Sequence, residues 1–222
     1  MRAAIKTRFS ELPIEEVANT ITHGFGLLLS IAGFAALVVL AGLRGDPLLI
    51  AACVVYGVSL IVLYTASTVY HVTTCPELKH KLRVVDHCCI YLLIAGSYTP
   101  FGLVIINASH GQGLLAAIWI FALVGIAAKL ILRDRYSAIS VVSYLVMGWL
   151  GVLAVGPLLE VLGLAPVLLA VAGGLSYSLG VIFFAWHRIP HNHAIFHVFV
   201  LAGSIFHYAA VVLYVVPYTT NL

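Results

Sequence analysis

Two histidines near the C-terminal end of the chain have the spacing of a metal-binding pair. His193 and His197 lie in the segment HNHAIFHVFV, four residues apart. If this segment is helical, both imidazoles stand on one helix face, about 5–6 Å apart at Cβ. Imidazoles so placed can both bind one zinc ion at about 2.0–2.1 Å. The pair therefore predicts part of a metal site.

Three more residues have the chemistry to complete such a site. A third imidazole, from His71, would provide three nitrogen ligands and leave a fourth position open for water, which is typical of catalytic zinc. A carboxylate beside that water, from Asp86, can orient it and take its proton. Ser67 precedes His71 by four residues, so its hydroxyl shares that helix face and can hydrogen-bond the ligand or a substrate.

The elements that must position these residues are helices that span a membrane. The 222 residues are 63% hydrophobic and 9% charged, with a mean hydropathy of +1.12. Because a soluble domain has about 25% charged residues, this composition excludes a soluble protein and indicates a polytopic membrane protein. The N-terminal segment mixes acidic and basic residues and lacks a short apolar core, so we expect no cleavable secretion signal.

Seven apolar runs are about 20 residues long, which is the length that crosses a bilayer as a helix. The expected helices lie near residues 20–42, 48–70, 85–106, 113–132, 138–157, 164–186 and 193–216. The expected connections include TTCPELKHK at 73–81, GPLLEVLG at 156–163 and HRIPHN at 187–192. Short connections favour antiparallel neighbours in one bundle. We predict an all-α membrane protein, one seven-helix domain over 1–222 with a short N-terminal segment at 1–19.

Lysine and arginine orient this bundle. Ten of the 11 basic residues fall at the N-terminus or near the even-numbered connections, and Arg44 alone falls on the other side. Basic segments favour the cytoplasm, so we expect a cytoplasmic N-terminus, an external C-terminus and, in a bacterium, the plasma (inner) membrane. This topology accounts for the net charge of +3, so no nucleic-acid partner is expected.

The topology also brings the candidate residues to one layer. His71 ends the second expected helix, Asp86 begins the third, and the pair His193 and His197 begins the seventh, all at the cytoplasmic end. Three further polar residues lead into the first helix at that end and form an expected supporting network: Glu16, Asn19 and His23. The sequence therefore predicts a metal centre at the cytoplasmic end of the bundle.

Plainer interpretations remain open for several polar residues. An isolated histidine in a membrane helix is often a packing residue bonded to a neighbouring carbonyl, and this is our interpretation of His207. His187 and His191 are also four residues apart, but Pro190 between them breaks a helix. We expect both in the connection, with His191 as the substitute ligand. Asp86 could also simply pair with a basic residue of the preceding loop.

Four segments carry a family resemblance. They are EEVANTITH at 15–23, STVYH at 67–71 followed by Asp86, GSYTP at 96–100 and HNHAIFHVFV at 191–200. Together they resemble the haemolysin III family, the bacterial branch of the progestin and adiponectin receptor (PAQR) superfamily. The resemblance implies seven helices with a cytoplasmic N-terminus. It also implies zinc bound by His71, His193 and His197, with Asp86 holding the zinc-bound water and Ser67 close by.

The resemblance also implies an activity, because the superfamily is similar in layout to the alkaline ceramidases, which cleave lipid amides. We expect a zinc-dependent intramembrane hydrolase that cleaves a lipid amide or ester at the cytoplasmic side, with Asp86 and Ser67 as catalytic residues. A membrane lipid would be its substrate or ligand. The alternatives are a non-enzymatic, receptor-like sensor or regulator with structural zinc, and a channel-forming haemolysin-like protein. Imidazole ligands also suit divalent ions other than zinc, and no sequence feature indicates an oligomeric state.

Overall fold

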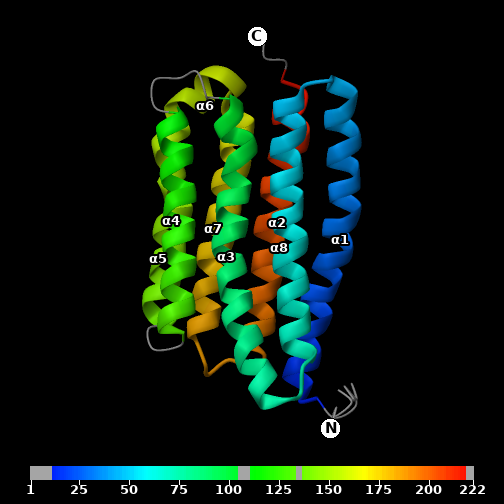
Figure 1. The fold of residues 1–222 in the computed structure, drawn as a ribbon, viewed down its shortest axis with the longest axis vertical. Helices are drawn as coiled ribbons and strands as arrows, with labels where there is room; N and C mark the ends of the chain where they lie inside the picture. Colours follow the sequence, from blue (N-terminus) through cyan, green and yellow to red (C-terminus); the bar gives the residue numbers. More distant parts are fainter. Residues whose placement is uncertain (1–11, 105–110, 134–136, 219–222) are drawn as a thin grey trace.

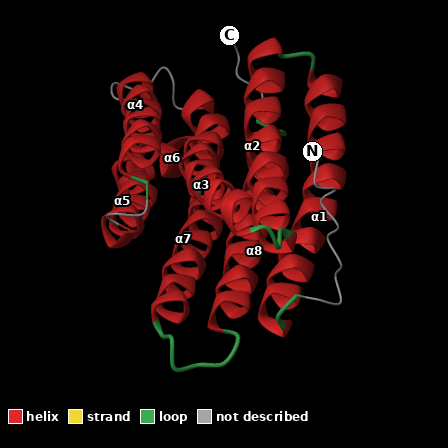
Figure 2. Ribbon diagram, turned by 60° about the horizontal axis from the view of Figure 1, so that its bottom comes forward, coloured by secondary structure: helices red, strands yellow, loops and turns green. Residues whose placement is uncertain are grey.

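The computed structural model describes residues 12–104, 111–133 and 137–218, and these residues form a bundle of helices without any strand. Figure 1 shows the helices side by side, and Figure 2 shows the same bundle turned toward one end. The α-helices are α1 (Ile14–Arg44), α2 (Pro47–Val72), α3 (Pro76–Val104), α4 (Gly111–Leu132), α5 (Ser137–Trp149), α6 (Val155–Leu162), α7 (Leu164–Ala185) and α8 (Asn192–Ala210).

Seven helical spans in the described part of the chain are long and apolar enough to cross a membrane, as the sequence predicts. The fifth span combines α5, a 3₁₀ turn at Leu150–Ala154 and α6, and the seventh combines α8 with a π-helical turn at Val211–Val215. Many leucine, isoleucine and valine side chains remain exposed along these spans, as expected for helices whose outer faces contact lipid. The all-α, seven-span prediction is confirmed.

The ends of the bundle follow the predicted alternation. The start of α1 lies at the same end as the connections at 73–75 and 186–191, and the end of α8 lies at the opposite end (Figure 1). We call the end that carries Ile14 and these two connections the basic end. The connection between α1 and α2 is at the other end, where Asp46 caps α2 through a 2.8 Å hydrogen bond from the amide of Leu48.

Two helices begin earlier than expected, and both extensions lie at the basic end. α1 begins at Ile14 rather than near 20, and α3 begins at Pro76 rather than near 85. A search for apolar runs misses such turns, because charged residues form helices as readily as apolar ones but do not mark a membrane crossing. Proline suits the first position of a helix, so most of the expected loop at 73–81 is helical. As a result, Glu16 stands on α1 itself.

The expected connection at 156–163 is also wrong in large part, because Val155–Leu162 forms α6. The break in the fifth span comes earlier, at the 3₁₀ turn, and Gly163 with a φ of 81° separates α6 from α7. Only glycine adopts such a backbone conformation without strain.

Contacts between the first and last helices determine the site. α1 contacts both α2 and α8, and α7 packs along α8. Figures 1 and 2 agree that α1, α2 and α8 lie together on one side of the bundle, with α4 and α5 on the other. Residues near position 20 therefore meet residues near positions 70 and 195.

Candidate metal centre

Three histidines from two helices converge at the basic end of the bundle. His71 is in the last turn of α2, and His193 and His197 are in the first turns of α8. One ring nitrogen from each lies within 4.8 Å of the other two. The ring centroids are 5.0 Å apart for His71 and His193, 5.0 Å for His71 and His197, and 4.7 Å for His193 and His197. The sequence expectation that these side chains meet is confirmed.

The ring of His71 is held by a carboxylate. Its Nδ1 lies 2.6 Å from Oε2 of Glu16, while its Nε2 is buried and has no hydrogen-bond partner. An Nδ1–H donating to Glu16 leaves the lone pair on Nε2. A carboxylate on the remote nitrogen of an imidazole is the usual support of a metal-bound histidine. The unpartnered Nε2 and the convergent nitrogens therefore fit a metal ion such as zinc.

Lys79 balances the charge of this carboxylate. Its Nζ lies 3.1 Å from Oε1 of Glu16. The same ammonium donates to the backbone carbonyls of Tyr70, His71 and Thr73 at 3.1–3.3 Å. Because Lys79 is in the extension of α3, it ties the start of this helix to the end of α2. In the sequence, Lys79 is only one of the basic residues that orient the bundle.

The hydrogen bonds of His197 select one of its nitrogens for metal binding. Its Nδ1 lies 3.2 Å from Oγ1 of Thr22, and this hydroxyl donates to the carbonyls of Ala18 at 2.9 Å and Asn19 at 3.0 Å. A hydroxyl has one proton, so Oγ1 of Thr22 accepts from His197 and Nδ1 carries the hydrogen. Nε2 is then the nitrogen with a free lone pair. Thr22 is a contributor that sequence analysis missed.

His23 lies inside the site, against His197. Its ring stacks face to face on His197, with centroids 3.4 Å apart and ring planes at 17°. Its Nδ1 is 2.7 Å from Oγ of Ser67, and its Nε2 is buried without a hydrogen-bond partner. Two members of the expected supporting network, Glu16 and His23, therefore contact the triad directly. Asn19 is buried nearby on α1, and its Oδ1 has no partner.

Asp86 and Ser67 lie next to each other in the wall of a cavity that His193 and His197 also line. Both side chains are buried, and Asp86 is within hydrogen-bonding reach of the Ser67 hydroxyl. Ser67 therefore connects His23 to Asp86 across α1, α2 and α3. The other expected ligand, His191, is exposed and precedes α8 with a φ of 57°, so it does not join the triad.

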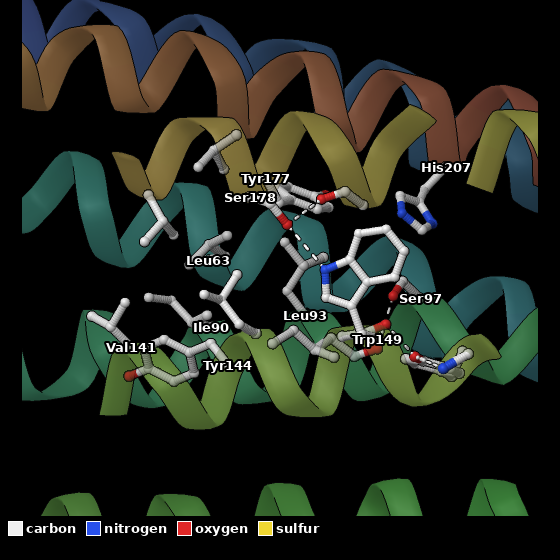
Figure 3. Close-up of a pocket in the computed structure, with 18 of the residues that line it drawn as sticks. Leu63, Ile90, Leu93, Ser97, Val141, Tyr144, Trp149, Tyr177, Ser178 and His207 are labelled. Carbon is white, nitrogen blue, oxygen red and sulfur yellow. Dashed lines mark hydrogen bonds between the residues drawn. The ribbon is translucent and has the colours of Figure 1, made fainter. Parts of the chain in front are cut away.

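Two cavities meet at the triad. The smaller, of about 280 Å³, is lined by polar residues that include Glu16, Asn19 and His71. The larger, of about 950 Å³, contains Asp86 and Ser67 in its wall and runs between the helices as far as His207. Figure 3 shows a part of the larger cavity whose wall includes the apolar side chains of Leu63, Ile90, Leu93 and Val141. His193 lines both cavities.

Comparison with known proteins agrees with the resemblance. A family model described as "Haemolysin-III related" matches residues 13–208. The chain is 43% identical to "Hemolysin-3" of Bacillus cereus over 211 residues, which cover 95% of this chain and 96% of that protein. It is 44% identical to the "Hemolysin-3 homolog" of Bacillus subtilis (strain 168) over 202 residues, covering 91% and 95%. The human "Monocyte to macrophage differentiation factor" is 32% identical over 225 residues, covering 95% and 88%.

Proposed function

The chain belongs to the haemolysin III family and is an integral multi-pass membrane protein, and on this premise we propose that it is a zinc-dependent hydrolase of a lipid amide or ester. One observation carries the proposal: a histidine triad lies where a polar cavity at the helix ends meets a long apolar cavity inside the bundle, and the buried carboxylate of Asp86 lines the apolar cavity together with His193 and His197. His71 lines the polar cavity, His197 lines the apolar one and His193 lines both, so water and a hydrocarbon chain can approach the triad from different sides.

In this proposal the metal is held by His71, His193 and His197. Zinc, when bound, polarises a carbonyl oxygen and lowers the pKa of water toward neutrality. Glu16 holds the His71 ring and adds negative charge beyond it, and Thr22 orients His197. Such outer contacts raise the basicity of the ligands and fix their orientation.

Asp86 is the general base. A carboxylate oxygen of Asp86 accepts a proton from the attacking water, whose oxygen adds to the carbonyl carbon of the lipid. The carbon–nitrogen or carbon–oxygen bond then breaks, and the proton passes to the leaving amine or alcohol. Ser67, whose hydroxyl lies within hydrogen-bonding reach of Asp86, keeps this carboxylate in position. The hydrocarbon chain lies in the larger cavity, whose apolar wall excludes water.

The charge distribution supports a cytoplasmic site. Lys79 and the other basic residues of the α2–α3 region lie at the same end of the bundle as the triad, and basic segments favour the cytoplasm. The proposal therefore places the metal centre at the cytoplasmic face of a bacterial plasma membrane, with a membrane lipid as substrate.

The test is the replacement of Asp86 by asparagine in detergent-purified protein. Asp86→Asn should keep the metal content of the wild type and lower the turnover of lipid amides or esters by about 10²–10⁴-fold, because asparagine cannot take a proton. Turnover would be followed by mass spectrometry on a panel of ceramides, N-acylethanolamines and phospholipids. Equal rates for the variant and the wild type would contradict the role of Asp86. No turnover of any member of the panel by zinc-loaded wild type would contradict the hydrolase.

A second candidate is a membrane sensor or regulator in which the metal has a structural role. The triad joins α2 to α8, so a metal would cross-link these two helices, and the bond between Glu16 and His71 would connect α1 to them. Chelation should then lower the melting temperature, because a ligand that binds only the folded state stabilises it. Both functions share this outcome, and the turnover measurement separates them.

A further inference from the structure

The far part of the larger cavity contains a second group of polar side chains. His207 of α8, Tyr177 and Ser178 of α7 and Trp149 of α5 line it together (Figure 3). Three of these groups have partners within the protein. Nε1 of Trp149 donates to Oγ of Ser178 at 3.0 Å, and the hydroxyl of Tyr177 lies 3.0 Å from Oγ of Ser204.

His207 differs from these neighbours. Its Nδ1 is buried and has no hydrogen-bond partner, although the imidazole lines the cavity and keeps part of its surface accessible. The expected bond from this histidine to a neighbouring carbonyl is therefore not made through Nδ1. A polar group without a partner in a membrane interior costs free energy. Packing alone does not account for a histidine here, since an apolar ring would fill the space without that cost.

The ring of His207 is held in place by α7. It stacks on Tyr177, with centroids 5.7 Å apart and ring planes at 26°. Gly173 allows the ring to approach the α7 backbone, because a Cβ at this position would overlap the imidazole. The imidazole of His207 is therefore packed against α7 while it lines the cavity.

The position of His207 along α8 defines a distance from the metal centre. Ten residues separate His197 from His207, and a helix rises about 1.5 Å per residue, so the two rings are about 15 Å apart along the helix axis. A hydrocarbon chain whose polar end lies at the triad would pass His207 along its length.

We propose that His207 is a specificity-determining residue that binds a hydroxyl group carried on the hydrocarbon chain of the lipid. This proposal rests on the part of the proposed function that puts the chain in the larger cavity. A hydroxyl both donates and accepts a hydrogen bond, so it satisfies a neutral imidazole in either tautomer. A carboxylate or ammonium at the same depth would bring a charge into the membrane interior, which is costly.

The test measures binding, so it does not depend on turnover. Zinc-loaded, detergent-purified protein would bind radiolabelled palmitic acid in competition with unlabelled palmitic acid and with hydroxypalmitic acids that differ in hydroxyl position. The wild type should bind one isomer, hydroxylated in the distal half of the chain, about five- to tenfold more tightly than palmitic acid. His207→Phe should lose this preference.

Two further variants make the result specific. Tyr177→Phe keeps the ring that stacks on His207 and removes a hydroxyl that bonds Ser204, so it should keep the preference. His207→Gln retains hydrogen-bonding groups and should keep part of the preference for the hydroxylated isomer. This variant also provides a test of the proposal if His207→Phe does not fold. Zinc content and melting temperature would establish that each variant is folded.

Each other outcome overturns the proposal. Equal binding of palmitic acid and every isomer by the wild type would mean that water alone satisfies His207. A preference that persists in both His207 variants would assign the hydroxyl to another residue. If palmitic acid does not bind at all, the larger cavity does not hold a hydrocarbon chain, and the premise of the proposal fails. If the protein keeps the binding preference but turns over no lipid, only the proposed hydrolase activity is contradicted, and the role of His207 stands.

Discussion

Glu16 and His71 form a 2.6 Å hydrogen bond between Oε2 and Nδ1, although 55 positions separate them in the sequence. The bond connects the first turn of α1 to the last turn of α2. It leaves Nε2 of His71 to face His193 and His197 without a protein partner. A buried imidazole nitrogen that has no protein partner and lies among two other imidazoles fits a metal ligand, since a bound ion would recover the cost of desolvating it.

The metal content of the purified protein is the first measurement to make. Elemental mass spectrometry on protein prepared without chelators should find about one zinc per chain, since the three imidazoles form a single site. The double variant His193→Ala/His197→Ala should lose it. His191→Ala is the matched control, because His191 is exposed, and should keep it. A wild type without metal would remove the basis of both proposed functions.

Replacing Glu16 by glutamine should weaken zinc binding by about 10–100-fold, which is the usual effect of losing the partner of a metal-bound histidine. The amide can still fill the space, but it removes the negative charge between His71 and Lys79. Competition with a fluorescent zinc chelator measures the affinity.

Glu15→Gln provides the control for this change. Glu15 stands in the same first turn of α1, but its side chain is exposed and makes no ion pair among those found in the described residues. The zinc affinity of the Glu15→Gln variant should equal that of the wild type. Equal losses in both variants would mean that general charge, rather than the contact with His71, determines the affinity.

The orientation in the membrane can be tested with a native cysteine. Cys75 is exposed in the connection between α2 and α3, whereas Cys53, Cys88 and Cys89 are buried. A membrane-impermeant maleimide should label Cys75 in inverted vesicles but not in intact spheroplasts, because the basic end is expected to face the cytoplasm. Mass spectrometry identifies the labelled residue, and Cys75→Ser should abolish the signal. Labelling of Cys75 in intact spheroplasts would reverse the topology.

Local features of the fold could be read from the sequence. The number of spans follows from apolar runs as long as a bilayer is thick, and all seven are present. The shared face of His193 and His197 follows from helix periodicity alone. The starts of α1 and α3 could not be read in this way, because the charged turns at Glu16 and Lys79 extend beyond any apolar run.

Relations between helices were decided by the tertiary structure. The stacking of His23 on His197, the contact of Thr22 with His197 and the bond between Glu16 and His71 all depend on how α1 packs against α2 and α8. The cavity that reaches His207 depends on the space left between α3, α5, α7 and α8. Spacing along a chain specifies neighbours within one helix, but the rotation and depth of one helix against another come from packing over their whole lengths. The sequence by itself therefore determined the spans and the ligand types, and the packing of the helices decided which side chains hold the ligands in place.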